Sequence, residues 1–243
     1  MPASDAGPHR YFLARELPAL VHDEALAHGP GVVVDLGAGD GGLLFALERE
    51  GLLADTAYAV DLSEERLAFS TSLSSKIRAV RADATAVPLA DGVADGVVCT
   101  QVIEHLHDDR QLAPEIARLL KPGGWLYVAT VLRGPGAWWI YRRDGRFVLD
   151  PTHVREYPDE GAFRTALAHP ELELARVRSE PLRFPVLDLA LRALAFTRVL
   201  SFDSLPGLYE RAPGVAAVLR RIRVPVPGYR LVETVGRKAD GSR

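Results

Sequence analysis

A glycine-rich turn flanked by carboxylates is the first feature of this sequence that could do chemistry. The stretch "VVVDLGAGDGG" contains Gly37, Gly39 and Gly42 in G-x-G-x-x-G spacing, and Asp35 precedes the first glycine by two residues. Such a turn between a strand and a helix lets a ligand approach bare backbone at the helix N-terminus. Asp61 follows Gly42 by 19 residues, close to the distance of about 20 at which a carboxylate binds ribose hydroxyls. These residues predict a ligand that contains a nucleoside.

Asp35 distinguishes between two classes of nucleoside ligand. A carboxylate at the end of this strand would repel the doubly negative pyrophosphate of NAD(P), because like charges at short range are unfavourable. It suits a ligand that brings a cation, such as S-adenosylmethionine, which carries an ammonium, a sulfonium, a ribose and an adenine but no phosphate. Asp35 could meet the ammonium directly or through water, and Asp61 would accept hydrogen bonds from the ribose hydroxyls. The structural alternative is a carboxylate that only caps the turn.

Two further stretches end where this ligand needs them. In "RADATAVPL", Asp83 and Ala84 follow an expected strand, where a carboxylate and a backbone N–H can bind the adenine amino group and a ring nitrogen. In "PLADGVADGVVCTQVIEHLHD", the next strand ends near Gln101. Open α/β sheets bind ligands at this carboxyl edge, so these residues are expected to lie on the same side of the sheet.

Alternating strands and helices are expected to hold these residues in place. Short β-branched apolar runs alternate with helix-like runs through the first 130 residues, which predicts an α/β fold with a parallel, doubly wound sheet. The expected strands are 31–36, 57–62, 76–83, 95–101 and 125–132, and the expected helices are 42–50, 63–72 and 108–120.

The second half of the chain follows a different pattern. Residues 133–147 are expected to form a long loop, 157–169 a helix, and 172–180 and 229–238 two more strands. The segment between those strands is longer than an ordinary connection, and its Leu- and Ala-rich part, 182–203, is predicted to be helical. We expect a single domain (1–243) made of an N-terminal helical segment (1–30), a cofactor-binding core (30–132) and a substrate-side part (133–243).

Four motifs in the first half together resemble a known family. "VDLGAGDG", "AVDLSEERL", "ADATAVPLADGVADGVVCTQVIEHL" and "LLKPGGWL" are similar to the class I S-adenosylmethionine-dependent methyltransferases, in particular the bacterial small-molecule subgroup known as methyltransferase type 11/12. The resemblance is dense over residues 30–132 and continues through "DPTHVREYPDEGAF", which is similar to a His-x-Arg-x-Tyr segment of those enzymes. It implies a Rossmann-like, mostly parallel seven-stranded sheet, here with a helical insertion near the C-terminus.

The resemblance also implies a role for individual residues. It places Asp35, Gly37, Ala38 and Gly39 at the methionine part of the cofactor, Asp61 and Leu62 at the ribose, Asp83 and Ala84 at the adenine, and Gln101 beside the reacting centre. One departure is Asp40, where many members have a small or uncharged residue. We expect its side chain to point to solvent.

Histidines are the candidates for acid–base chemistry. Methyl transfer from a sulfonium is an in-line displacement, and a hydroxyl nucleophile benefits from a base whose pKa is near neutral. His105 and His153 are the catalytic candidates, whereas His107 is expected to face solvent. The structural alternatives are that His105 packs against the following helix and that His153 tethers a loop together with Arg155 and Tyr157.

Two other features bear on substrate and metal. Glu104, His105 and Asp108 are potential metal ligands close in sequence, but such residues at a helix start are more often polar surface, so no metal is expected. The loop 133–147 carries aromatic and arginine side chains that could select a substrate or could pack as a lid; they are Trp138, Trp139, Tyr141, Arg133, Arg142, Arg143 and Arg146.

Composition excludes several function classes. The net charge of −3 and the missing Asn/Asp-Pro-Pro-aromatic motif argue against a nucleic acid substrate. The single cysteine, the absence of a recognisable signal peptide and the absence of an apolar run of about 20 residues predict a cytoplasmic protein without a transmembrane segment. We expect a small-molecule acceptor that is methylated on oxygen. Residues 182–203 could form a core helix or a homodimer surface, or they could contact an apolar or lipid-linked acceptor. The alternatives are an NAD(P)-dependent oxidoreductase and a non-catalytic S-adenosylmethionine-binding protein.

Overall fold

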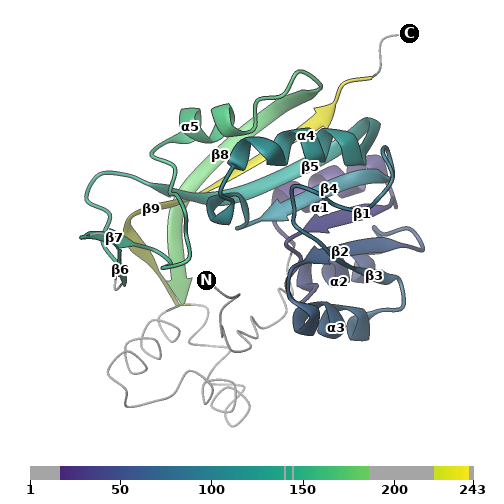
Figure 1. Ribbon diagram of the computed structural model, residues 1–243, viewed down its shortest axis with the longest axis horizontal. Helices are drawn as coiled ribbons and strands as arrows, with labels where there is room; N and C mark the ends of the chain where they lie inside the picture. The colour runs from purple at the N-terminus through teal and green to yellow at the C-terminus, as the bar shows by residue number, and fades with distance from the viewer. Residues whose placement is uncertain (1–16, 140, 144, 186–221, 241–243) are drawn as a thin grey trace.

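A seven-stranded sheet forms the centre of the computed structural model, which describes residues 17–139, 141–143, 145–185 and 222–240 (Figure 1). The strand order is β3-β2-β1-β4-β5-β9-β8. The first five strands run parallel, and β9 and β8 add to the sheet antiparallel. This confirms the predicted mostly parallel, doubly wound fold. The strands are β1 (Val33–Leu36), β2 (Ala57–Asp61), β3 (Ile77–Arg81), β4 (Ala94–Thr100), β5 (Leu120–Arg133), β8 (Leu172–Pro185) and β9 (Arg223–Lys238).

Helices cover both faces of the sheet, which is why its central strands are apolar on both sides. Successive side chains of a strand point to opposite faces. Val34 packs with α4 and α5 in one core cluster, and Val33 packs with α1, α2 and α3 in the other. The helices are α1 (Ala19–His28), α2 (Gly42–Arg49), α3 (Glu64–Leu73), α4 (Leu112–Leu119) and α5 (Glu160–Ala166), with short 3-10 helices η1 (Ile103–His105) and η2 (Asp109–Gln111) before α4.

Helix α3 begins where its sequence predicts. The Ser63 hydroxyl accepts a hydrogen bond from the Arg66 N–H at 3.4 Å, and Glu64 and Glu65 occupy the first turn. A hydroxyl cap and first-turn carboxylates both stabilise a helix N-terminus.

The second half departs from the sequence predictions in three places. The predicted loop 133–147 contains a hairpin, β6 (Tyr141–Arg143) and β7 (Arg146–Val148), and β5 already begins at Leu120, before the predicted residue 125. The helix predicted from residue 182 is wrong as far as residue 185, because β8 continues there and Pro185 pairs with Arg223 of β9. The rest of the predicted helical insertion and dimer surface, 186–203, lies outside the described residues.

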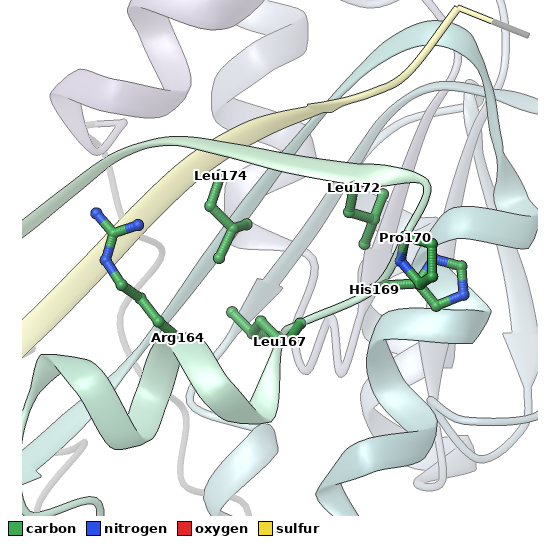
Figure 2. Close-up of a pocket in the computed structure, with 7 residues that line it drawn as sticks. Arg164, Leu167, His169, Pro170, Leu172 and Leu174 are labelled. Atoms are coloured by element: carbon green, nitrogen blue, oxygen red, sulfur yellow. The ribbon is translucent and has the colours of Figure 1, made fainter. Parts of the chain in front are cut away.

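A shallow hollow lies away from the carboxyl edge of the parallel strands. It has a volume of about 540 Å³ and lies between α5 and the start of β8 (Figure 2). Its lining consists of Arg164, Leu167, Ala168, His169, Pro170, Leu172 and Leu174, none of which is a predicted site residue. Within the described ranges, the helices are too short or too polar to cross a membrane.

A close approach between two chain segments fixes the conformation of the glycine turn. Gly37 has a φ of 73°, and a Cβ built on it would lie 2.2 Å from Cγ2 of Val102, which follows β4. Any side chain at position 37 would therefore push apart the segments that follow β1 and β4.

We predict that Gly37→Ala lowers the free energy of unfolding by about 1–2 kcal/mol for the left-handed backbone and by about 1–3 kcal/mol more for the clash with Val102. Gly51→Ala is the matched control, because Gly51 has a φ of 71° but open space around the missing Cβ. Urea unfolding of both variants measures the difference. Equal losses would show that the contact with Val102 costs nothing.

Candidate active site

The glycine turn uses its own backbone donors within the protein. The N–H groups of Gly37 and Ala38 donate to the Val60 carbonyl at 2.8 and 2.9 Å, and the Gly39 N–H donates to the Asp61 carboxylate at 2.9 Å. A pyrophosphate would need such N–H groups to be free. The N–H donors of Gly37, Ala38 and Gly39 are therefore already used within the protein and are not available to a ligand.

Asp35 is a buried carboxylate with an unsatisfied oxygen. Its exposed fraction is 2%, and Oδ1 has no hydrogen-bond partner among the described residues. Burial, followed by the nearby charge of Asp61, raises the pKa of Asp35 from 3.8 to about 7. A buried charge without a partner is costly, and a cation placed against it would remove most of that cost.

Asp61 is held at the end of β2 with both of its oxygens engaged. Oδ2 accepts from the Gly39 N–H and Oδ1 accepts from the Ser63 N–H, both at 2.9 Å. Each carboxylate oxygen has a second lone pair, which leaves acceptor capacity for ligand hydroxyls. The next side chain, Leu62, is 65% exposed, so its apolar surface is open for contact with a ligand.

The other predicted cofactor residues follow the neighbouring strands. Asp83 is exposed after β3, and its Oδ1 accepts from the N–H and hydroxyl of Thr85 at 2.9 and 2.7 Å, which leaves Oδ2 for a ligand. Ala84 is buried beside it. Gln101 follows β4 with a φ of 55°, which is unusual for a residue other than glycine and typical of functional sites.

Asp40 does not point to solvent as predicted. Its side chain is mostly buried, with 15% exposed, and Oδ1 lies 3.6 Å from Nε of Arg66 on α3. The sequence prediction is wrong because α3 packs close to the glycine turn and supplies a counter-charge there.

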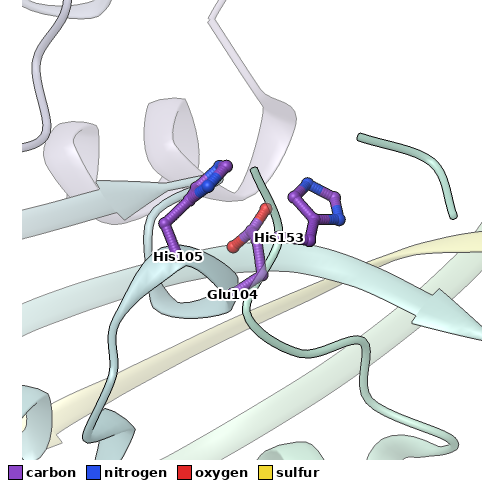
Figure 3. Close-up of side chains that lie close together, drawn as sticks. All are labelled: Glu104, His105 and His153. Atoms are coloured by element: carbon purple, nitrogen blue, oxygen red, sulfur yellow. The ribbon is translucent and has the colours of Figure 1, made fainter. Parts of the chain in front are cut away.

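The two candidate catalytic histidines lie together with Glu104, although 48 residues separate His105 from His153 (Figure 3). Their ring centroids are 4.9 Å apart in an edge-to-face arrangement. Glu104 is fully buried, and its Oε2 accepts a hydrogen bond from the Thr130 hydroxyl at 2.7 Å. Burial raises the pKa of Glu104 to about 6. Burial and the neighbouring His153 lower the pKa of His105, so its imidazole is neutral at neutral pH.

Backbone hydrogen bonds bring His153 to this cluster. The N–H groups of Val154 and Arg155 both donate to the Glu104 carbonyl, at 2.9 and 3.2 Å. Arg155 and Tyr157 reach further to Asp109, with the Tyr157 hydroxyl 2.6 Å from Oδ2. The tether predicted as an alternative for His153 is therefore made by Arg155 and Tyr157, while His153 itself faces Glu104 and His105.

Two residues close in sequence to the cluster, Asp108 and His107, are not part of it. Asp108, considered as a metal ligand, accepts from the Arg110 N–H and caps η2, and the group of potential ligands contains His153 in its place. His107 is exposed, as predicted.

Three side chains around the cluster have no part in the sequence prediction. Glu156 is buried, with Oε1 3.4 Å from Nδ1 of His153 and Oε2 3.3 Å from Nε of Arg133. Thr152 contacts His105, and Thr130 contacts Glu104. The only sequence signal for Glu156 is its place within "HVREY", and nothing in the sequence connects Thr130 with Glu104.

The loop after β5 divides its aromatic side chains between core and surface. Trp139 is buried and packs on Phe184 with ring centroids 5.3 Å apart, as expected for a lid. Trp138 is 51% exposed beside Phe147, and the Arg142 guanidinium lies 4.6 Å from the centre of that Phe147 ring. Trp138 and Arg142 are exposed, as Arg143 and Arg146 are, so aromatic and cationic side chains of this loop are both open to a ligand.

We predict that Asp35→Asn stabilises the unliganded protein at high pH. Because the pKa of Asp35 is about 7 when folded and 3.8 otherwise, the wild type loses stability as pH rises from about 4 to 7. Above pH 7 the variant should have a free energy of unfolding on the order of 4 kcal/mol higher, since about three pKa units separate the folded and unfolded values and each corresponds to about 1.4 kcal/mol. Urea unfolding at several pH values measures this difference. An equal pH dependence of the free energy of unfolding in both proteins would show that the charge of Asp35 is compensated within the protein.

Comparison with known proteins identifies a methyltransferase domain in the first half of the chain. Residues 34–128 match the family model of the methyltransferase domain. The chain is 33% identical over 125 residues to a "Probable S-adenosylmethionine-dependent methyltransferase" of Mycobacterium tuberculosis, covering 51% of this chain and 42% of that one. It is 31% identical over 122 residues to a ubiquinone biosynthesis O-methyltransferase of Sodalis glossinidius, covering 48% of each. The matches thus span about half the length of these relatives.

Solved structures show the same fold. YcgJ of Bacillus subtilis has a TM-score of 0.60 at 19% identity, over 91% of this chain and all 100% of its own. The geranyl diphosphate C-methyltransferase of Streptomyces coelicolor has a TM-score of 0.60 at 16% identity, and the match covers 90% of this chain and 74% of that one. The cyclase SpnF has a TM-score of 0.59 at 19% identity, and the match covers 91% of this chain and 80% of that one. At these identities the likeness concerns the fold alone.

The sheet order, the residues after the parallel strands, the matching domain and the named relatives agree with one another. Residues 34–128 therefore form a methyltransferase domain similar to those of the class I S-adenosylmethionine-dependent methyltransferases.

Proposed function

We propose that this protein transfers the methyl group of S-adenosylmethionine to a small-molecule acceptor, with a hydroxyl oxygen as the favoured nucleophile. The observation that carries the proposal is the buried, unsatisfied carboxylate of Asp35 beside the glycine turn. The ammonium of S-adenosylmethionine supplies the cation that this carboxylate lacks. Asp61 and Leu62 would then meet the ribose, and Asp83 and Ala84 the adenine.

The same arrangement disfavours an NAD(P)-dependent oxidoreductase. Gly37, Ala38 and Gly39 already donate their N–H groups within the protein, and Asp35 would face the pyrophosphate with like charge. The N-terminus of α2 alone remains for a phosphate, opposite a carboxylate that repels it.

The chemistry needs little from the protein besides positioning. The acceptor oxygen attacks the methyl carbon in line with the C–S bond, and the pair of electrons of that bond stays on sulfur, which gives S-adenosylhomocysteine. The hydroxyl proton passes to a base. His105, neutral because its pKa is lowered, and its neighbour His153 are the groups proposed to accept it.

Oxygen is favoured as the methylated atom for two reasons. The relatives that match at about one-third identity include ubiquinone biosynthesis O-methyltransferases of Sodalis glossinidius and Bordetella avium. A pair of adjacent imidazoles also suits removal of a hydroxyl proton.

We predict that the protein binds S-adenosylhomocysteine and does not bind NADH, and that Asp61→Ala raises the dissociation constant of S-adenosylhomocysteine at least about tenfold. Each hydrogen bond to a charged group contributes roughly 1.5–3 kcal/mol, and about 1.4 kcal/mol is tenfold in affinity. Isothermal titration calorimetry measures all three constants. Asp55→Ala is the control, since Asp55 is an exposed carboxylate before the opposite end of β2.

Binding of NADH in place of S-adenosylhomocysteine would overturn the proposal. Transfer of a labelled methyl group to a panel of hydroxylated small molecules tests the activity itself. Tight cofactor binding without transfer to any acceptor would favour the non-catalytic alternative.

We predict that His153→Ala lowers kcat by about 10²–10⁴-fold, the usual contribution of a group that moves a proton, while affinity for S-adenosylhomocysteine changes little. His107→Ala, which removes an exposed imidazole near the same segment, should leave both quantities unchanged. Steady-state kinetics with an accepted substrate decide this, and equal kcat values for the two variants would remove His153 from the proposed site.

A further inference from the structure

Glu104, His105 and His153 present a set of metal ligands that acid–base catalysis does not require. Each offers one ligand atom, and these atoms all lie within 4.8 Å of one another (Figure 3). Ligand atoms at about 2.1 Å from a tetrahedral ion lie roughly 3.4 Å apart, so closure by at most about 1.4 Å would complete the geometry. His105 is half-buried and follows directly from Glu104 in η1, so rotation of its side chain can provide that closure.

The hydrogen bonds of both histidines leave the correct nitrogen free. Nδ1 of His105 lies 3.3 Å from the Thr152 carbonyl oxygen, which can only accept, so Nδ1 carries the proton. The Thr152 hydroxyl lies 3.2 Å from the same nitrogen and gives its own hydrogen to Asp150. Nδ1 of His153 likewise faces a Glu156 oxygen at 3.4 Å. In both rings Nε2 is therefore left with a lone pair, as in histidines that bind metals and are oriented by a second acceptor.

A separate observation points to a missing ligand. Oε1 of the fully buried Glu104 has no hydrogen-bond partner among the described residues, although Thr130 satisfies Oε2. An unpaired carboxylate oxygen inside a protein is costly, and nearly all such atoms have a partner. A cation bound by Glu104 together with His105 and His153 would supply one.

We propose that Glu104, His105 and His153 bind a divalent first-row transition-metal ion. Two imidazoles and one carboxylate suit Zn²⁺, Fe²⁺, Mn²⁺ or Co²⁺, whereas Mg²⁺ prefers oxygen ligands and retains water. Three protein ligands leave at least one coordination position open, as in catalytic zinc sites. Val154 and Arg155 hold the third ligand in place through the Glu104 carbonyl.

The task of the ion rests on the proposed function. An acceptor hydroxyl bound to the open position loses its proton more easily, because a bound cation lowers the pKa of an oxygen ligand. The proton then passes to solvent, and the oxygen attacks the methyl carbon while the C–S electron pair remains on sulfur. The two histidines act in this case as ligands, and the acceptor class is a molecule whose oxygen binds a Lewis acid.

The test uses the full chain without an affinity tag, stripped of metal by a chelator and then desalted. Titration with Co²⁺ should show one bound ion per chain, with a visible d–d absorption band and a dissociation constant in the micromolar range or below. Zn²⁺ should displace Co²⁺, and Mg²⁺ at the same concentration should not. His105→Ala and His153→Ala should weaken Co²⁺ binding at least about tenfold, and Glu104→Gln should do the same.

Two histidine variants serve as controls. His107→Ala removes an exposed imidazole and His169→Ala a half-buried one, both outside the cluster, and both variants should bind Co²⁺ as the wild type does. Each variant is first compared with the wild type in melting temperature and in S-adenosylhomocysteine binding. If Glu104→Gln does not fold, the half-buried His105 decides the matter. Absence of Co²⁺ binding, displacement by Mg²⁺ at equal concentration, or equal binding by His105→Ala and the controls would overturn the proposal.

The readouts separate this inference from the proposed function. S-adenosylhomocysteine binding and methyl transfer without any bound metal would leave the proposed function intact and overturn the metal site. Stoichiometric Co²⁺ binding at the three residues without cofactor binding would support the metal site and overturn the proposed function.

Discussion

The pairing of β1 with β4 in the middle of the sheet is the constraint on which the site depends. The chain order reverses there, with β2 and β3 on one side and β5 on the other, so the segments after β1 and β4 emerge next to each other. Gly37 and Val102 then come so close that no side chain fits at position 37. The glycine turn and η1 are thus fixed against each other, and η1 carries Glu104 and His105.

Two carboxylates make this edge of the sheet unlike an ordinary core. Asp35 and Glu104 are both buried, each keeps one oxygen without a partner among the described residues, and burial raises the pKa of both. A core selected for stability alone would not retain them, since an apolar residue of similar size would cost less. Packing around the rigid parallel sheet therefore compensates for the free-energy cost of these two unsatisfied carboxylates.

Local patterns were enough to predict the first half of the fold. Buried parallel strands are continuous apolar runs, α3 begins at a serine followed by glutamates, and Gly-rich turns mark the strand ends, so the elements can be located from neighbouring residues. The cofactor residues follow from the same patterns, since each comes directly after a strand. The β6–β7 hairpin was missed although its strands are neighbours in the sequence and the pair Asp144-Gly145 between them is a local hairpin signal. The extension of β8 to Pro185 was missed because pairing with a distant partner such as Arg223 leaves no local pattern. Asp40 was mispredicted for a similar reason, since its counter-charge Arg66 comes from a neighbouring helix.

The sequence by itself determined that the sheet is mostly parallel and doubly wound, and which residue types follow its strands. Period-two and helical patterns, turn residues and the spacing between Asp35 and the glycines are properties of short stretches, so they can be recognised without the tertiary structure. Only the tertiary structure decided which of these side chains meet. It placed His153 against Glu104 and His105 and excluded Asp108, because two backbone hydrogen bonds to the Glu104 carbonyl join segments that are about 50 residues apart in the chain. Contacts of that range depend on the geometry of the whole sheet, which no single motif encodes.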